Sequence, residues 1–137
     1  MRGWLQTPEI DLFFSQPAFD QRHGFESARH TAELANSRHD LIRSALLHDV
    51  GKRHVRMGPI GRSLVSVWAK LGGKTTGRWR AYLDHGQIAA QELSEIREEP
   101  IVVDFARHHH GERPPSIGPE DWDLLIRADK AGPGSRV

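Results

Sequence analysis

Apolar residues recur at intervals of three and four along most of the chain, and this spacing constrains the fold more than any other feature. It is the period of one face of an α-helix. Segments with this period are bounded by glycine, proline or polar connectors; they span residues 20–35, 39–50, 64–71, 79–96, 100–106 and 119–129. The longest strand-like run covers only residues 101–103. The sequence therefore predicts an all-α fold, a single bundle of about six helices.

The chain length fits one domain. With 137 residues, it can bury a hydrophobic core of its own. We expect an N-terminal arm over residues 1–19 that packs on the domain, the helical domain itself over residues 20–131, and a flexible tail over residues 132–137, which is rich in glycine.

The absence of cysteine excludes several classes of site. A disulfide framework, a thiolate zinc site, an iron–sulfur cluster and a cysteine nucleophile are all ruled out. No apolar run approaches the roughly 20 residues that span a bilayer. The first residues hold no apolar core of a signal peptide. We therefore expect a cytoplasmic protein with no membrane partner.

Charge is distributed unevenly, although the net charge is only +1. Residues 50–83 contain no acidic residue but eight lysines and arginines. Such a segment can attract an anion. The alternative is a solvated basic face without a ligand. Arg53 and Arg56 in this segment, and Arg113 in a later loop, are candidates for contacts with phosphate groups of a substrate.

The adjacent pair His48 and Asp49 ends an apolar helical segment. A buried imidazole and carboxylate must be paired or bound to a metal, because burying them alone costs several kcal/mol. Both can reach one site only near a helix end, where Gly51 lets the backbone turn away. The same dipeptide at His39 and Asp40 stands at the polar start of the segment, where capping and solvent explain it.

Further potential ligands lie on other predicted helices, at or near their ends except for His85, which lies within the helix predicted over residues 79–96. They are His23, His85, His108, His109 and Asp129. Helix phase predicts that His108 and His109 point inward and that His110 points sideways, with His109 the preferred ligand and His108 the second choice. Imidazole and carboxylate without thiolate suit Fe, Mn, Zn, Ni, Co or Mg, which the sequence does not distinguish. We expect the metal site to lie between the helices.

These residues resemble the H…HD…D signature of the HD superfamily of metal-dependent phosphohydrolases, over roughly residues 20–130. Lys52 completes an HD-x-G-K string that is common there. His85 in an H-G-x-x-A-A context and the cluster of three histidines resemble the members with two metal ions. The order of motifs is most similar to a small branch that includes HD-type dinucleoside tetraphosphate hydrolases, and it also resembles the GYP-type cyclic-di-GMP phosphodiesterases.

The resemblance implies a site with two divalent ions that activates water. Asp49 would bridge the ions, with His23, His48 and Asp129 on one ion and His85 and His109 on the other. Lys52 would contact the phosphate or the bridging water. Asp49 and Lys52 are thus the expected catalytic residues, and Lys52, Arg53, Arg56 and Arg113 the expected substrate contacts.

We therefore expect a metal-dependent phosphohydrolase that cleaves a phosphate ester or anhydride of a small nucleotide-like substrate. One alternative is a signalling module that binds a nucleotide without turnover. Another is a cyclic-dinucleotide phosphodiesterase, although residues 111–115 read GERPP where that branch carries its GYP motif. Nucleic acid is not an expected partner, because the basic segment lacks interleaved aromatic residues.

Overall fold

The computed structural model describes residues 3–54, 59–74, 77, 80 and 83–131, and these residues are helical with connecting turns. Along the described chain lie α1 (Thr7–Phe14), α2 (Ala18–Leu34), α3 (His39–Leu47), the 3₁₀-helix η1 (Val50–His54), α4 (Pro59–Lys70), α6 (His85–Glu95), α7 (Pro100–His108) and α8 (Pro119–Ala131). None of the described residues is in a β-strand. The predicted all-α fold is confirmed.

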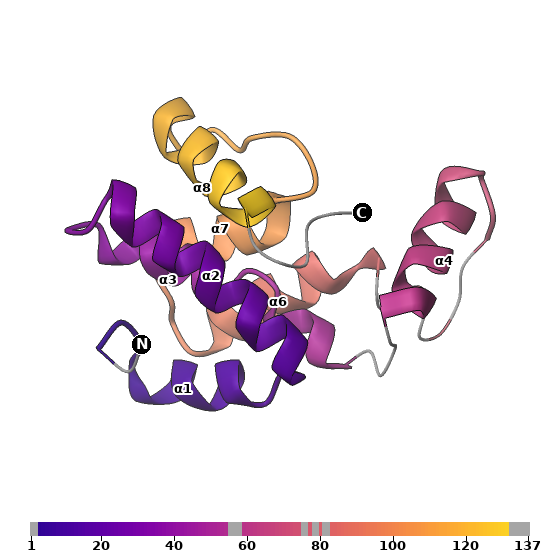
Figure 1. Ribbon diagram of the computed structural model, residues 1–137, viewed down its shortest axis with the longest axis horizontal. Helices are drawn as coiled ribbons and strands as arrows, with labels where there is room; N and C mark the ends of the chain where they lie inside the picture. The colour runs from indigo at the N-terminus through magenta and orange to yellow at the C-terminus, as the bar shows by residue number, and fades with distance from the viewer. Residues whose placement is uncertain (1–2, 55–58, 75–76, 78–79, 81–82, 132–137) are drawn as a thin grey trace.

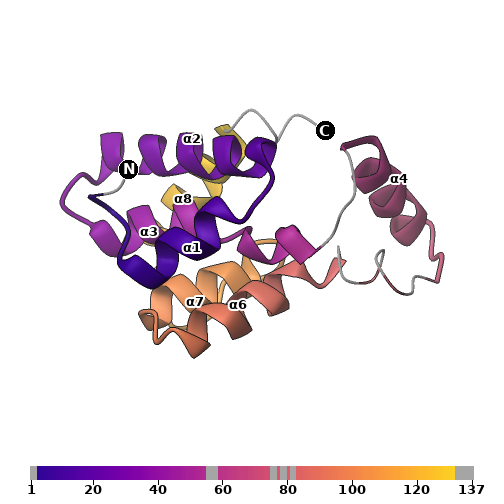
Figure 2. The same cartoon turned by 90° about the horizontal axis from the view of Figure 1, so that it is seen from below.

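Helix α3 lies at the centre of the bundle. Its residues from Leu41 to Leu47 are all buried, and the chain stays buried through Gly51. Helix α3 packs on α2, α7 and α8, while α6 packs on α7 and η1 (Figures 1 and 2). A helix that is buried all round presents its C-terminal end to the interior rather than to solvent. This position determines where the His48–Asp49 pair lies.

Several helix boundaries coincide with proline or glycine residues in the sequence. Pro100 begins α7, where its fixed φ and missing N–H suit a first turn. Helix α4 ends at Lys70, and the positive φ of Gly72 (79°) lets the N–H groups of Gly72 and Gly73 bond back to the carbonyls of Ala69 and Trp68 in a Schellman motif. Within the predicted helix 79–96, the structure has α6 from His85 to Glu95. Residues 79, 81 and 82 lie outside the described residues, as does the expected tail at 132–137.

The N-terminal segment contains a helix that the sequence analysis did not predict. Phe13 of α1 is fully buried, and Leu5 before it belongs to the same hydrophobic core as α3 and α7. The carboxylate of Glu9 accepts a hydrogen bond from the backbone N–H of Gln6, which caps the first turn of α1. The expected boundary between an arm and the helical domain stays a prediction.

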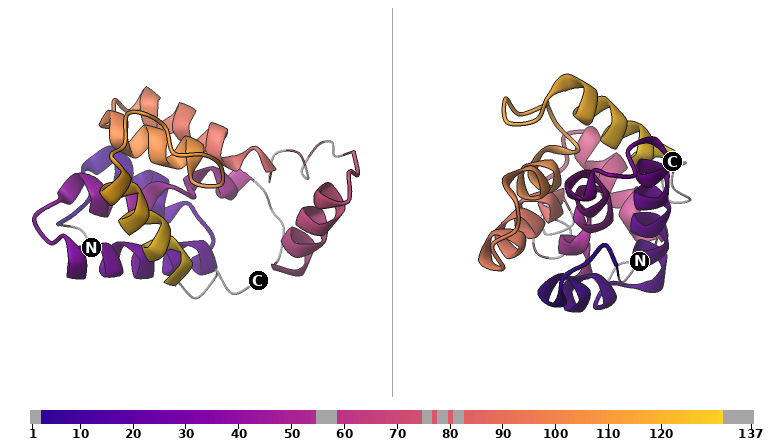
Figure 3. Two further views of the ribbon diagram at one scale, coloured as in Figure 1. Left: turned by 90° about the horizontal axis from the view of Figure 1, so that it is seen from above. Right: turned by 90° about the vertical axis from the view of Figure 1, so that its left-hand side faces the viewer.

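Helix α4 stands apart from the rest of the protein. In three directions of view it lies to one side of the bundle (Figures 1, 2 and 3). No other described helix packs extensively on it. Among the described residues, no helix is both long enough and apolar enough to cross a membrane.

A cluster of charged side chains around Arg43 of α3 connects α1 to the bundle. The guanidinium of Arg43 on α3 faces three carboxylates: its Nε lies 3.4 Å from Oε1 of Glu9 and 3.6 Å from Oε2 of Glu98, and its Nη2 lies 2.7 Å from Oε1 of Glu99. Glu9 is only 1% exposed. Burial, together with the neighbouring Glu98 carboxyl, raises the pKa of Glu9 to about 8. One arginine cannot neutralise three carboxylates, so the cluster retains a proton near neutral pH.

This proton makes stability depend on pH. Because the pKa of Glu9 is higher in the folded than in the unfolded state, its stabilising contribution is complete below pH 4.5 and is lost as pH rises through about 8. We expect the free energy of unfolding of the wild type to fall by about 2–4 kcal/mol from this group between pH 5 and pH 9. Glu9→Gln keeps a neutral side chain at every pH and should remove that decline.

Denaturant unfolding across this pH range checks the prediction. Glu112→Gln, at an exposed carboxylate outside the cluster, is the matched control and should retain the wild-type slope. A Glu9→Gln variant whose stability falls with pH as steeply as the wild type would contradict the assignment.

Candidate metal centre

The His48–Asp49 pair occupies the turn between α3 and η1. Helix α3 ends at Leu47, His48 is its C-cap residue, and η1 begins at Val50. His48 is 1% exposed and Asp49 is 2% exposed. Adjacent residues on a helix point about 100° apart, and the end of α3 allows both side chains to face one region. The expectation that these two residues lie together in the interior is met.

One group of donors forms on one side of Asp49. His23 from α2 and Asp129 from α8 are joined by a 2.8 Å contact between Nε2 and Oδ1, and Nε2 of His48 lies 3.0 Å from the same oxygen. Oδ2 of Asp49 lies 3.7 Å from Nε2 of His23 and 3.4 Å from Nε2 of His48. Four side chains from two helices and one turn thus converge on one small region.

A second group forms on the other side of Asp49. Oδ1 of Asp49 lies 3.1 Å from Nε2 of His85 and 3.4 Å from Nε2 of His109. The two Nε2 atoms are 3.4 Å apart, and His110 contributes a further ring nitrogen to this group. Two nitrogens bound to one ion at about 2.1 Å, near tetrahedral angles, lie roughly 3.4 Å apart. The spacing therefore suits a shared cation.

Asp49 connects the two groups through its two oxygens. Oδ2 faces His23 and His48, whereas Oδ1 faces His85 and His109. Among the described residues, neither Oδ1 of Asp49 nor Nε2 of His48 has a well-formed hydrogen bond, although both atoms are buried. Buried polar atoms normally have a partner. The donor set, nitrogen and oxygen without sulfur, fits divalent metal ions, and the described residues can hold them.

Backbone carbonyls orient two of the imidazoles. Nδ1 of His48 lies 2.8 Å from the carbonyl oxygen of Ala45, and Nδ1 of His109 lies 2.8 Å from that of Ala106. In each case the N–H at Nδ1 donates to the carbonyl, so in the neutral ring, the form that binds a metal, Nε2 carries the lone pair and faces Asp49. Histidines that bind a metal through one ring nitrogen typically donate a hydrogen bond from the other ring nitrogen.

The pKa shifts in the first group show that its carboxylates favour a positive charge. Burial alone lowers the pKa of His48, but the carboxylates of Asp49 and Asp129 outweigh burial and raise it to about 9. Burial opposes ionisation of Asp49, yet Lys52 and His48 hold its pKa well below the usual range. The pKa of Asp129 is also lowered, because His48 and His23 outweigh its burial. A cation can take the place of the His48 proton here.

The second group favours neutral rings. Burial lowers the pKa of His109, and burial together with His109 and His85 lowers the pKa of His110 to about 3. Neutral imidazole is the form that binds metal ions. At neutral pH these two rings are therefore already in the binding form.

The cluster of three histidines is arranged differently from the expectation. His109 and His110 lie near His85, with ring centroids 5.4 Å and 5.0 Å away, whereas His108 belongs to neither donor group. Helix α7 ends at His108, so helix phase does not extend to His110. The turn that follows, closed by a bond from the N–H of Gly111 to the carbonyl of His108, carries His110 back toward the site. His108, the expected second choice of ligand, therefore belongs to neither donor group, whereas His110, expected to point sideways, is exposed but joins the second group.

The residues expected to contact substrate have diverse surroundings. Nζ of Lys52 lies 2.6 Å from Oδ2 of Asp49, at the centre of the site. Arg53 instead makes two bonds of 2.8 Å and 2.7 Å to the carboxylate of Glu92 on α6. Arg113 donates to the carbonyl of Ile117 within its own loop. Arg56 lies outside the described residues.

The second His–Asp dipeptide lies away from the centre, as expected. His39 is exposed at the start of α3. The carboxylate of Asp40 accepts bonds of 3.0 Å and 2.9 Å from Arg38, which lower its pKa. The cap position itself is Arg38, so Asp40 acts in the first turn and not as the cap.

Close backbone contact brings α6 to Asp49. A Cβ on Gly51 would stand 2.1 Å from the carbonyl oxygen of His85 and 2.8 Å from the backbone nitrogen of Ala89. Gly51 was expected to provide a turn; the structure shows that its lack of a side chain permits η1 to touch the first turn of α6.

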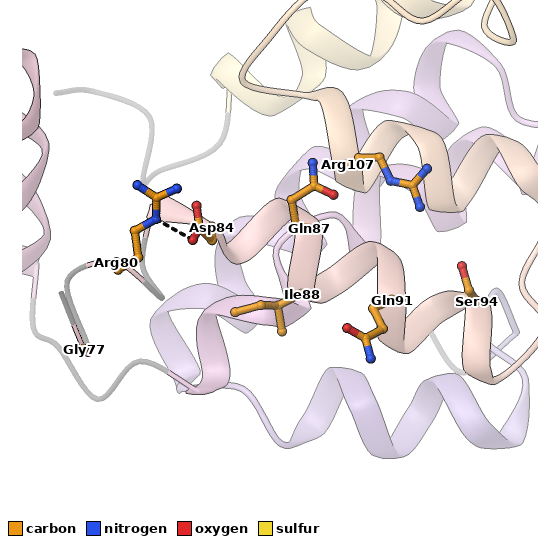
Figure 4. A pocket seen from close by; sticks show the side chains of 8 residues that line it. All are labelled: Gly77, Arg80, Asp84, Gln87, Ile88, Gln91, Ser94 and Arg107. Carbon is orange, nitrogen blue, oxygen red and sulfur yellow. Dashed lines mark hydrogen bonds and ion pairs between the residues drawn. The ribbon is translucent and has the colours of Figure 1, made fainter. Parts of the chain in front are cut away.

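A separate groove of about 900 Å³ runs along the outer face of α6. Its lining residues include Gln87, Gln91 and Arg107, and an ion pair of 2.7 Å joins Arg80 to Asp84 at one end (Figure 4). No lining residue belongs to either donor group. The groove therefore lies apart from the candidate metal centre.

Comparison with protein families gives one match, which covers most of the chain. The family model described as HD domain matches residues 21–131, a range that includes every residue of both donor groups. Searches of curated proteins and of solved structures each returned no match.

The contact at Gly51 generates a prediction. Gly51→Ala must push η1 away from α6 and move His85 from Asp49, because a Cβ cannot lie 2.1 Å from a carbonyl oxygen. We expect a loss of about 2 kcal/mol or more in the free energy of unfolding and at least a tenfold loss in affinity for Mn²⁺. Denaturant unfolding and metal titration measure the two effects. Gly3→Ala, where a Cβ meets nothing within 4 Å, is the control and should change neither. Wild-type metal affinity in Gly51→Ala would show that this contact does not position His85.

Proposed function

The chain belongs to the HD domain family, and we propose that it hydrolyses a phosphate ester or anhydride of a small nucleotide-like substrate with the aid of two divalent metal ions. Family membership itself indicates a metal-dependent phosphohydrolase in general and divalent metal binding. The main support for a site with two metal ions is the carboxylate of Asp49, because its two oxygens face two separate groups of histidines.

The proposed ligands follow the two donor groups. His23, His48 and Asp129 would hold one ion, His85 and His109 the other, and Asp49 both. His110 stands beside the second group as a further nitrogen donor. Ions bound there would lower the pKa of a water molecule and polarise a phosphoryl group. Fe, Mn, Zn, Ni, Co and Mg all suit nitrogen and oxygen ligands, so the proposal names no single metal.

Lys52 supports this chemistry in two ways. Its ammonium contacts Oδ2 of Asp49 at 2.6 Å and is one cause of the lowered pKa that keeps this carboxylate ionised. It also provides a positive point charge next to the donor groups, where a phosphate group would arrive. Asp49 and Lys52 are therefore the residues to which we assign direct roles in the reaction.

Two features support a phosphorylated small molecule as substrate. The segment from residue 50 to residue 83 is free of acidic residues and begins at the metal centre, so its field attracts anions. The chain offers Lys52 near the centre, whereas Arg53 is held by Glu92 and Arg113 by its own loop. We therefore propose Lys52 as the main cationic contact with phosphate.

Replacing Asp49 tests the proposal directly. Asp49→Ala removes the ligand common to both groups, so the protein should lose most of its bound metal, and kcat toward p-nitrophenyl phosphate or its bis-ester should fall by about 10³-fold or more. Elemental analysis and these assays, followed by a panel of nucleotides, are the measurements. His39→Ala, in the dipeptide at the start of α3, is the matched control and should leave both unchanged. Equal damage from the two variants, or no hydrolysis by the metal-loaded wild type, would overturn the proposed function.

Replacing His85 tests the number of ions. His85→Ala leaves the first donor group complete but removes a nitrogen 3.1 Å from Oδ1 of Asp49. We expect metal content to fall from about two ions per chain to about one, with a loss in kcat of about 10²-fold or more. Metal analysis beside single-turnover kinetics separates the two effects. Full metal content with normal turnover would instead indicate a site with one ion.

A further inference from the structure

An apolar stripe on α4 faces solvent. Leu64, Val67, Trp68 and Leu71 are 62%, 56%, 50% and 78% exposed. They follow one another at i, i+3, i+4 and i+7, so they lie along one side of α4 and its C-terminal turn. Val65, between them in sequence, is fully buried. The stripe is thus the outer side of a helix that has a buried side as well.

Nothing described in the fold covers this stripe. Helix α4 stands to one side of the bundle, and no other described helix packs extensively on it (Figures 1 and 3). Contiguous exposed apolar residues of this size mark an interaction site rather than ordinary surface. The metal centre does not use them, since both donor groups lie among α2, α3, α6, α7 and α8.

The charge of the surrounding segment narrows the choice of partner. Residues 50–83 carry eight lysines and arginines and no acid, and Lys70 and Lys74 are exposed at the C-terminal end of α4. Two copies meeting through this side of α4 would bring the exposed Lys70 and Lys74 of each copy together, which is electrostatically unfavourable. An anionic surface is the complementary partner. The side chain of Trp68 suits a boundary between apolar and aqueous phases, and its indole N–H donates to the carbonyl of Lys74 at 3.2 Å.

We propose that α4 lies in the surface of an anionic phospholipid bilayer, with the stripe of Leu64, Val67, Trp68 and Leu71 among the acyl chains and the exposed Lys70 and Lys74 against the headgroups. A helix of 12 residues is about 18 Å long, too short to span the roughly 30 Å apolar layer, so it lies in the plane of the interface. This departs from the expectation of no membrane partner, which rested on the search for a spanning segment and a signal peptide.

Vesicle sedimentation of the full-length protein tests the proposal. The probes are vesicles of phosphatidylglycerol and phosphatidylcholine in equal parts, with pure phosphatidylcholine as the neutral reference. The wild type should bind the anionic vesicles, bind the neutral ones at least about tenfold more weakly, and detach as salt rises. Brominated acyl chains should quench its fluorescence, and Trp68→Phe should lose most of that quenching.

Two variants separate the contributions. Leu64→Ser with Leu71→Ser removes half the stripe, and Lys70→Glu with Lys74→Glu reverses the charge beside it; each pair should weaken binding at least about tenfold. Leu34→Ser is the matched control, since Leu34 is 64% exposed on α2, and it should bind as the wild type does. Circular dichroism verifies that each variant is folded.

Three results would overturn the proposal. The first is no binding of the wild type to anionic vesicles. The second is binding that the stripe variant retains in full. The third is a concentration-dependent dimer, measured by sedimentation without lipid, that the Leu64→Ser and Leu71→Ser variant abolishes, because the stripe would then be an interface between two copies.

Discussion

The buried carboxylate of Asp49 is the interaction on which the rest of the structure depends. A carboxylate that is 2% exposed loses most of its hydration, and this loss must be offset by neighbouring positive charge or hydrogen-bond donors. Lys52 and His48 are the charges that keep its pKa low, and His85 and His109 place ring nitrogens 3.1 Å and 3.4 Å from its Oδ1. Because these partners come from η1, α6 and the ends of α3 and α7, the arrangement of the helices and the ionisation of one side chain depend on each other.

Glycine lets the helices approach closely at the metal centre. Gly24 follows His23, Gly51 stands two residues after Asp49, and Gly86 follows His85. A Cβ at each would approach a backbone oxygen: 2.8 Å from Leu46 for Gly24, 2.1 Å from His85 for Gly51 and 2.8 Å from Ala106 for Gly86. An imidazole reaches only a few ångströms from its own backbone, so histidines on separate helices can share one carboxylate only if those helices pack at the shortest distances. The donors and the glycines beside them form one packing arrangement.

The sequence predicted the parts of this arrangement that depend on local pattern. Helical periodicity located the described helices after α1, and the cost of burying a histidine and an aspartate together indicated the centre at His48 and Asp49. The sequence did not predict features that depend on the exact end of a helix or on contacts between residues far apart in the chain. His110 reaches the site because α7 ends at His108, a boundary that periodicity locates only to within a few residues. Arg53 is held by Glu92, which is 39 residues away in the chain, and no local pattern predicts that ion pair.

The protein has two buried charged clusters on α3, and their donor chemistry explains why only one is suited to metal ions. Around Arg43 the neighbours are the carboxylates of Glu9, Glu98 and Glu99, with a guanidinium already among them. The guanidinium neutralises only part of that negative charge, and a proton on Glu9 relieves the excess. Around Asp49 the neighbours are imidazoles, and the Nδ1 bonds of His48 and His109 leave Nε2 with its lone pair toward the carboxylate. Lone pairs that converge on a shared carboxylate are what a divalent ion requires. The middle of α3 and the turn at its C-terminal end therefore balance negative charge in different ways, the first with a bound proton and the second with nitrogen donors that can accept a metal.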